Sequence, residues 1–339
     1  MEWAKHTALW DLRELRGTWG NSGELRGTWG NSGELGGTRG NSGELKGTRG
    51  NSETEKNPLY SLAQQVQAGE LTLEQALTQA TGLTELDEES VQEAGALAEV
   101  IADQSLPLAY TLALLVEAAA GRASTPYLIG QLAGVRGSML LRLGQAEDAL
   151  AAFTTSLQAL HAAGDRRAEG TALGNLGSAY AALGWVEQAI EYYQQALAIA
   201  REIGDRRSEG NILGNLGSAY SDLGQVEQAV EHYQQALAIA REIGDRRSEG
   251  SDLSNLGLAY ADLGQVEKAI EYYEQALQIS REIKDRRGEG NALGNLGNAY
   301  FQLGQVEQAI GCYEQALQIA GEIGDRRTLG VTLSRLGDA

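Results

Sequence analysis

The sequence repeats itself from residue 165 onward, and the period does not change. The tripeptide Asp-Arg-Arg starts each copy 40 residues after the last, at Asp165, Asp205, Asp245, Asp285 and Asp325. A Leu-Gly pair marks the middle of each copy, at Leu183, Leu223, Leu263 and Leu303. A fixed period of this length indicates structural units that bury their apolar faces against one another. The chain is therefore predicted to form a stacked array rather than a globule around one core.

Within one copy, residues 205–244, the pattern predicts two helices. Gly204 suits a left-handed helix end, and Asp205 suits the N-cap of the first helix. Apolar residues then fall on one helical stripe until Leu223 and Gly224 interrupt it, and a second stripe follows over 226–240. The chain has 3 prolines and 2 phenylalanines, while 44 glycines and many alanines, leucines, glutamates and glutamines dominate it. Because strands favour β-branched and aromatic residues, we expect an all-α protein.

The spacing of small and aromatic residues in each copy resembles the tetratricopeptide repeat signature. In one copy the pattern is formed by Leu216, Gly217, Tyr220, Gly224, Ala229, Tyr233 and Ala236. The longer period resembles the repeats of kinesin light chain and of the G-protein-signalling-modulator adaptors, and also bacterial arrays attached to caspase-like or nucleotide-binding switch domains. The resemblance implies a right-handed α-solenoid of antiparallel helix pairs over residues 125–339. Its copies would cover residues 125–164, 165–204, 205–244, 245–284 and 285–324, with a partial copy over 325–339.

The residues before the array fall into two segments. Residues 1–55 contain a glycine-rich decamer that starts at Glu14 and recurs from Glu24, Glu34 and Glu44. Such a stretch buries too little apolar surface to offset its chain entropy, so we expect it to be disordered. Residues 56–124 show no period and predict irregular helices over 59–68, 72–80, 88–103 and 108–120. We expect these helices to cover the exposed end of the array.

The charge of the chain limits its partners. With 27 basic and 46 acidic residues, the formal net charge is −19. Nucleic acids and anionic membranes are bound by clustered cationic side chains, so neither is an expected partner. The most apolar run, residues 107–120, is short and contains Glu117, and the amino terminus lacks the apolar core of a secretion signal. The single cysteine, Cys312, fits a reducing compartment, so we expect a cytoplasmic protein.

Residues that could support catalysis are scattered through the sequence. The three histidines, His6, His161 and His232, occupy unrelated positions, and no histidine–cysteine cluster has the spacing of a metal site. The Gly-Asn-Leu-Gly segment at 174–177 lies in a predicted helix, without the preceding strand and the lysine of a nucleotide-binding loop. We therefore expect no enzyme activity, no metal and no cofactor.

The first helix of each copy carries an asparagine that we expect to face a ligand. At 100° per residue, Asn215 lies about 200° from Leu213, away from the buried stripe. The resemblance implies that the first helices line a concave groove and that asparagines at this position contact peptide backbones. The asparagines are Asn175, Asn215, Asn255 and Asn295. Two alternatives remain open: each asparagine could hydrogen-bond to a neighbouring first helix, or duplication could have copied it passively.

Further residues on the outward side of the first helices are predicted to line the groove. They are Asn211, Asn291, Ser178, Ser218, Asn298, Asp222 and Asp262. Those that differ between copies are the candidates for determining specificity. Phe301 replaces Ala181, Ser221 and Ala261 of the other copies. The carboxy-terminal end of the groove could therefore carry an apolar pocket, or Phe301 could pack against a following helix.

Two arginines follow each aspartate cap, in the first helical turn, where a cation opposes the helix dipole. They either pair with acidic side chains of the preceding second helix, such as Glu202 or Glu242, or reach a carboxylate on a ligand. Intramolecular pairing is the favoured interpretation. Arg207 and Arg247 are nevertheless candidate groove residues, in which case the bound segment would be acidic.

The predicted function is a non-catalytic scaffold that binds a protein or peptide segment in the groove of the solenoid. The alternative is the sensor or scaffold arm of a larger signalling or caspase-like protease system whose effector domain lies elsewhere. The last copy favours that alternative, because residues 330–339 complete only a first helix and Leu333 and Leu336 lack a partner helix. The sequence predicts no oligomeric state.

Overall fold

The computed structural model describes residues 57–82, 94–98, 101–102, 105–120, 125–325, 330, 332 and 334–335. These residues form two compact units, and the second begins at Thr125. Every described element is an α-helix, as predicted, and none of these helices is long and apolar enough to cross a bilayer. The decamer segment, residues 1–55, lies outside the described residues. The disorder predicted for it therefore stays a prediction.

The first unit contains three helices of known extent. They are α4 (Pro58–Ala68), α5 (Leu73–Gly82) and α7 (Leu106–Ala120). The Asn57 side chain caps α4 by accepting hydrogen bonds from two backbone N–H groups of its first turn. Helices α4 and α5 pack on α7, whose Leu112 and Leu115 are fully buried. The helices predicted over 59–68, 72–80 and 108–120 are confirmed, while only short parts of 88–103 are described as helical. That this unit covers the array stays a prediction.

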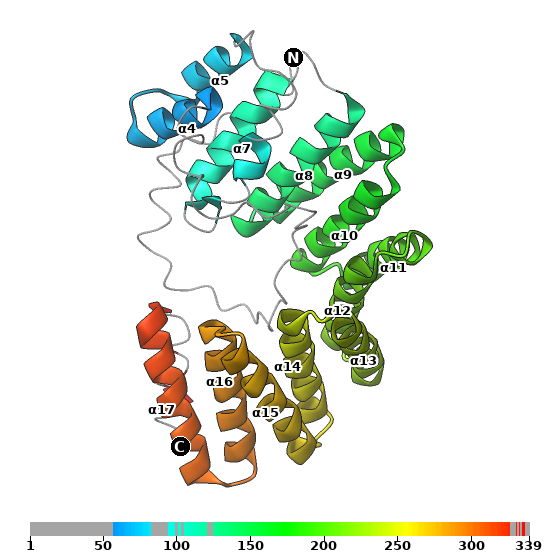
Figure 1. Cartoon of the computed structure of the whole chain (residues 1–339), viewed down its shortest axis with the longest axis vertical. Helices are drawn as coiled ribbons and strands as arrows, with labels where there is room; N and C mark the ends of the chain where they lie inside the picture. The colour runs from blue at the N-terminus through cyan, green and yellow to red at the C-terminus, as the bar shows by residue number, and fades with distance from the viewer. Residues whose placement is uncertain are drawn as a thin grey trace. The chain divides into compact units, whose positions relative to one another are not determined.

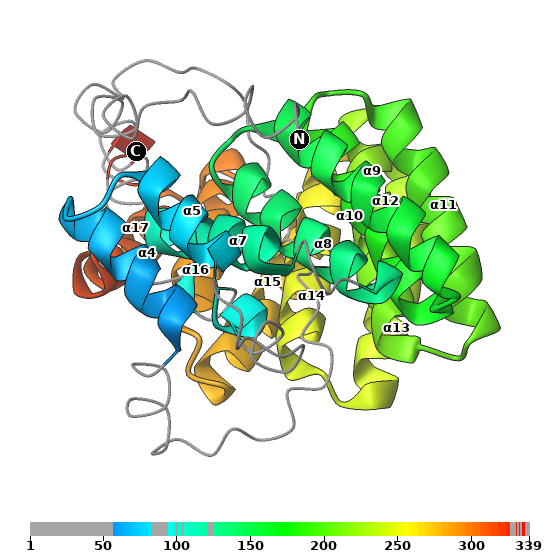
Figure 2. The same cartoon turned by 90° about the horizontal axis from the view of Figure 1, so that it is seen from above.

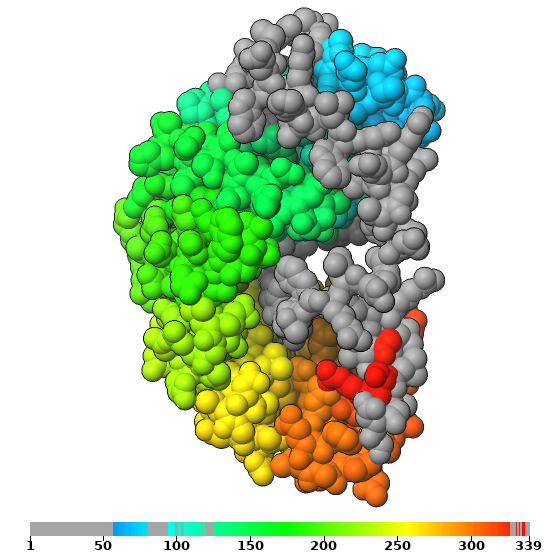
Figure 3. All heavy atoms as spheres, turned by 180° about the vertical axis from the view of Figure 1, so that it is seen from behind, coloured from blue at the N-terminus to red at the C-terminus, as the bar shows by residue number. Residues whose placement is uncertain are grey.

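The second unit is a run of antiparallel helix pairs that follow one another along an arc (Figure 1). The pairs are α8 (Pro126–Arg142) with α9 (Ala146–Ala163), α10 (Arg166–Ala182) with α11 (Val186–Glu202), α12 (Arg206–Asp222) with α13 (Val226–Ile243), α14 (Arg246–Asp262) with α15 (Val266–Glu282), and α16 (Arg286–Gln302) with α17 (Val306–Ile323). Each second helix also packs against the first helix of the next pair. Figure 3 shows the heavy atoms of these pairs as a continuous band from green to orange. This unit is a right-handed α-solenoid.

The first helices line the inner side of the arc. Successive first helices, from α8 to α16, contact one another directly. Successive second helices, such as α11 and α13, make at most marginal contacts among the described residues. In a curved stack the more closely spaced row lies on the concave side. Figures 1 and 2 agree, since α11 and α13 lie outside α10 and α12.

The ends of the helices are set by the residues that the sequence indicates. The Asp205 carboxylate accepts a hydrogen bond from the backbone N of Ser208 at 3.1 Å, so Asp205 caps α12. Gly204 and Gly224 adopt φ values of 68° and 72°, the left-handed conformation that glycine reaches without steric cost. The helix ends predicted at Gly204 and at Leu223-Gly224 are confirmed.

Each pair closes around an aromatic ring that lies on a glycine of the first helix, a phenylalanine in the pair of α8 and α9 and a tyrosine in the other four. A Cβ atom built on Gly217 would lie 2.6 Å from Cδ1 and Cε1 of Tyr233, and the same holds for Gly177 and Tyr193. The two tyrosine side chains are buried. The small residue of the repeat signature is therefore needed because the ring takes the space that any side chain would fill.

Lys284 is the one described residue other than glycine with a positive φ, 59°, and it occupies the turn position held by Gly204 and Gly244 in other copies. This conformation costs a residue with a Cβ atom roughly 1 kcal/mol relative to glycine. Replacing Lys284 with glycine is expected to raise the free energy of unfolding by about that amount, measured by urea denaturation. The converse change, Gly244→Lys, serves as the matched control and should lower it. Equal stability of both variants and the wild type would contradict the prediction.

Candidate binding groove

Four asparagines form a row along the inner helices, with one on each of α10, α12, α14 and α16. They are Asn175, Asn215, Asn255 and Asn295, and all four are half-buried. None of their side chains forms a hydrogen bond with any residue that the structure describes. The Nδ2 atom of Asn295 is buried and has no acceptor among the same residues. The alternative in which these asparagines link neighbouring first helices therefore finds no supporting bond.

The other polar residues predicted for the groove differ in their surroundings. Asn211 and Asn291 are exposed near the middle of α12 and α16. Asp222 and Asp262 are exposed at the last residues of α12 and α14, and neither forms an ion pair with a described residue. Partial removal from water raises the pKa of both aspartates. The inner face thus carries carboxylates that the described part of the chain does not neutralise.

Three residues predicted to determine specificity are instead held by tyrosines of the second helices. The Tyr233 hydroxyl donates to Oγ of Ser218 at 3.0 Å, and the Tyr313 hydroxyl donates to Oδ1 of Asn298 at 2.9 Å. The hydroxyl groups of Ser178 and Tyr193 lie 3.2 Å apart in the same arrangement. These bonds join the two helices of a pair, so the three polar groups stabilise the pair whether or not a ligand is present.

Phe301 lies on α16, the inner helix of the last described pair, and its side chain remains largely exposed, at 41%. It lines a hollow of about 310 Å³ together with Asn298, Gln302, Tyr313 and Arg335. The lining of this hollow mixes aromatic rings with polar groups, so the apolar pocket suggested by the sequence stays a prediction. Arg335, from the segment after α17, provides one wall.

Acidic and basic residues at the start of each first helix form what we call the arginine–glutamate clamp. In one copy it consists of Arg201, Arg206, Glu209 and Glu242. Arg201 Nε, at the end of α11, donates to Glu209 Oε1 at 2.8 Å, and Arg206 Nη1 donates to Glu209 Oε2 at 2.5 Å. Arg206 Nη2 also donates to Glu242 Oε2, at the end of α13, at 2.5 Å. The clamp therefore links three successive helices.

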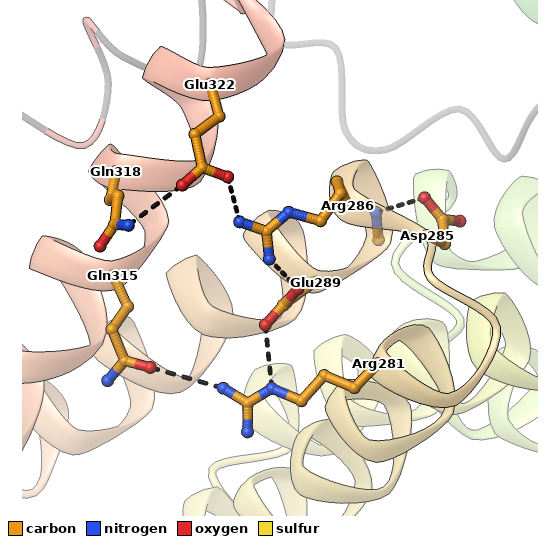
Figure 4. A network of polar contacts seen from close by, with 8 residues as sticks. Arg281, Asp285, Arg286, Glu289, Gln315, Gln318 and Glu322 are labelled. Carbon is orange, nitrogen blue, oxygen red and sulfur yellow. Dashed lines mark hydrogen bonds and ion pairs between the residues drawn. The ribbon is translucent and has the colours of Figure 1, made fainter.

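The clamp recurs in the following copies. Figure 4 shows Arg281 and Arg286 on either side of Glu289, with Glu322 at the far end. In the first copy His161 takes the place of Arg201, and its Nδ1 lies 3.0 Å from Glu169. The central glutamates of the clamp were not predicted as site residues from the sequence. They are Glu169, Glu209, Glu249 and Glu289. The signal was present, since a glutamate follows the first arginine by three residues in four of the five copies, a spacing that brings side chains together on a helix.

The first arginine after each described cap, from α10 to α16, is paired within the chain, as favoured from the sequence, but the partner helix was predicted wrongly. Arg206 pairs with Glu242 of the following second helix rather than with the preceding one. Arg207 Nη1 lies 2.6 Å from Asp245 Oδ2, so its charge is directed at the cap of the next copy. The expectation of an acidic ligand rested on free arginines, and Arg207 is not free.

The pKa of Glu209 reflects two opposing causes. Burial of the carboxyl, which is part of a residue only 7% exposed, acts to raise the pKa. The hydrogen bonds from Arg201 and Arg206 act in the opposite direction and outweigh it, so the pKa lies below its usual value. Glu209 is therefore ionised at neutral pH, and its charge is compensated by two guanidinium groups.

One further recurring contact joins the first helix of a pair to the second by ring stacking. His232 stacks on Tyr220 with ring centroids 5.1 Å apart, as Tyr192 stacks on Tyr180 at 5.0 Å. Cys312 occupies the same position in the last pair and is half-buried, and burial raises the pKa of its thiol. His232 and Cys312 are thus packing residues, and a raised pKa makes the thiol a poorer nucleophile.

Stacked helix pairs with an inner row of polar side chains define a helical-repeat scaffold. A sequence profile described as Tetratricopeptide repeat matches residues 128–202, 170–242, 208–282, 249–322 and 288–339. The chain belongs to the tetratricopeptide repeat family. No curated protein matches it in a sequence comparison.

Solved structures share the fold at low sequence identity. A Rap protein complexed with competence and sporulation factor is 17% identical, with a TM-score of 0.61, and the match covers 83% of each chain. Putative kinesin light chain repeats from P. anserina are 23% identical, with a TM-score of 0.51, and the match covers 60% of this chain and 100% of that one. A signal transduction ATPase from Pyrococcus horikoshii with a tetratricopeptide repeat sensor is 18% identical, with a TM-score of 0.59, and the match covers 85% of this chain and 48% of that one. These likenesses concern the fold.

Proposed function

We propose that this protein binds an extended protein or peptide segment along the inner face of its first helices. The observation that carries the proposal is the row of Asn175, Asn215, Asn255 and Asn295, whose side chains stand without hydrogen-bond partners in the described chain. A carboxamide can donate and accept at once, so it can pair with a peptide backbone whatever the sequence of that peptide. The buried Nδ2 of Asn295 lacks an acceptor among the described residues, which favours a ligand that supplies one there.

The fold gives the proposal a second line of support. A tetratricopeptide repeat array is a protein-interaction scaffold, in which many modest contacts along an elongated surface add up to useful affinity. The Rap protein, whose fold is similar, is seen in complex with competence and sporulation factor. For this chain, the spacing of the asparagines along successive helices favours a bound segment in an extended form.

A second candidate function is the sensor arm of a larger signalling system. The observation that favours it is the likeness to the P. horikoshii ATPase, where the match spans about half of that protein. In this case the same groove would receive the signal, and a separate effector would respond to it. The two functions share the groove and differ in the response that binding triggers.

Replacing Asn215 and Asn255 together with alanine is expected to weaken binding roughly tenfold or more, because each lost amide hydrogen bond contributes about 1 kcal/mol. The measurement uses peptides selected from a random display library on the full chain, followed by calorimetric titration of wild type and variant. Thermal unfolding should hardly change. The control variant is Gln228→Ala on the exposed surface of α13. Unchanged affinity, or a large drop in the melting temperature, would contradict the proposal.

A further inference from the structure

The middle of the inner face contains a carboxyl group that the fold does not need. Asp252 on α14 is only 7% exposed, yet it forms no hydrogen bond or ion pair with a described residue. The corresponding positions in the other copies hold Ala172, Ile212 and Ala292, which are all buried. A buried polar group without a partner is unfavourable by about 1–3 kcal/mol. Asp252 therefore departs from the repeat pattern in a way that packing does not explain.

The Asp252 carboxyl lies beside a glycine of the neighbouring inner helix, where no side chain fills the space. A Cβ atom built on Gly214 of α12 would lie 3.6 Å from Asp252 Oδ1. Gly214 is half-exposed, so no side chain of α12 covers the carboxyl oxygen at this point. Burial raises the pKa of Asp252 to about 8, with help from the carboxylates of Asp245 and Glu249. The carboxyl is thus largely neutral at pH 7 in the unliganded protein, which makes its burial tolerable, and a cation placed beside it would favour the ionised form.

Two further carboxylates lie on the same two helices, at their C-terminal ends. Asp222 and Asp262 are exposed at the ends of α12 and α14 and have no ion-pair partner among the described residues. Burial raises the pKa of the Tyr233 hydroxyl to about 12, and the charges of Asp222, Asp252 and Asp262 contribute to the rise. All three carboxyl groups therefore raise the pKa of the same hydroxyl, the one that donates a hydrogen bond to Ser218.

The basic groups nearby are already engaged. Arg206 and Arg246 belong to arginine–glutamate clamps, and Arg207 pairs with Asp245. The chain as a whole carries a formal charge of −19, so its field attracts cations. The uncompensated charge on this part of the inner face is therefore negative, which reverses the acidic partner considered from the sequence.

We propose that the bound segment presents a lysine or arginine side chain between α12 and α14, where it pairs with Asp252 while Asp222 and Asp262 add negative charge at the ends of the same two helices. This inference rests on the proposed function, because it specifies the chemistry of the segment held by the groove. A cation beside Gly214 would supply the partner that the buried carboxyl lacks. Asp252 is thus a specificity-determining residue of the middle copies, and the asparagine row binds the backbone on either side.

The test uses the full chain and peptides selected on it from a random display library. Peptides are expected to be enriched in lysine or arginine at one position, and replacing that residue with norleucine should weaken binding at least tenfold, as measured by fluorescence anisotropy. Asp252→Ala should remove this preference, so that the lysine and norleucine peptides bind it equally. The alanine variant should fold, because Ala172 and Ala292 hold the same position in other copies. Asp252→Asn, which keeps the shape, should lose the preference as well.

The control variant, Glu227→Ala, removes the same charge from the exposed surface of α13 and should keep the preference. Selected peptides without a cationic residue, or a lysine preference that survives in Asp252→Ala, would overturn this inference even if the Asn215 and Asn255 variants confirm the groove. Conversely, a preference that Asp252→Ala removes would support the cation site even if the asparagine variants bind normally, so the two proposals can fail separately.

Discussion

Replacing Gly217 with alanine is expected to lower the free energy of unfolding by about 2 kcal/mol, because the new methyl group overpacks the helix pair. Its Cβ atom would lie 2.6 Å from two ring carbons of Tyr233, well inside the separation of about 3.5–4.0 Å at which carbon atoms attract. Gly257→Ala should cost more, since Cε1 of Tyr273 would lie 2.4 Å away. The ring is buried between the helices, so the pair must separate to make room.

The matched control is Gly174→Ala, in a first helix of the same kind but without a neighbour. Nothing lies within 4 Å of a Cβ atom built on Gly174, in the interior of α10. Alanine has a higher helix propensity than glycine, so the free energy of unfolding of this variant should rise by about 0.5–1 kcal/mol. Urea denaturation followed by far-UV circular dichroism measures both changes. Similar effects of the two substitutions would show that the tyrosine does not set the distance between the helices.

The second large effect is expected for Glu209→Ala, which should lower the free energy of unfolding by roughly 2 kcal/mol. The substitution leaves Arg201 and Arg206 without the acceptor that joins α11 to α12. The cost stays below that of a fully buried pair, because both guanidinium groups remain partly exposed to water. Thermal denaturation of the full chain measures the change.

Acidification separates the clamp from simple loss of packing. The folded-state pKa of Glu209 lies below that of the unfolded chain, so its contribution is present above about pH 4.3 and disappears as the pH falls through the lower, folded value. The wild type should therefore lose more stability on acidification than Glu209→Ala. Glu227→Ala, at an exposed position of α13, should behave like the wild type. Parallel pH profiles for all three proteins would exclude the clamp as the cause.

The sequence predicts the regular parts of this fold because the residues that cap, end and space the helices recur in each copy. The Asp205 cap, the left-handed Gly204 and Gly224 and the small residue at Gly217 each follow from local geometry and recur in other copies. The asparagine row could also be placed on the inner helices by helical angles. What it binds could not be predicted in this way, because helical angles carry no information about a partner.

The features that the sequence left unpredicted depend on contacts between copies. The partner of Arg206 lies 36 residues ahead, and only the antiparallel pairing of α12 and α13 brings Glu242 to it. Asp252 reads as an ordinary polar residue of a helix, and its burial emerges once α12 is packed beside α14. The available signal was that position 252 holds an aspartate where the other copies have alanine or isoleucine.

The arginine–glutamate clamp has a consequence for how such genes change length. Its contacts between units have fixed offsets along the chain: Arg201 meets Glu209, and Arg241 meets Glu249, each eight residues further on. If recombination removed residues 245–284 as a block, Arg241 would be followed at the same offset by Glu289. Whole units can thus be lost or inserted without leaving an arginine or glutamate of the clamp unpaired. A deletion of any other length breaks the ion pairs of the clamp at the junction.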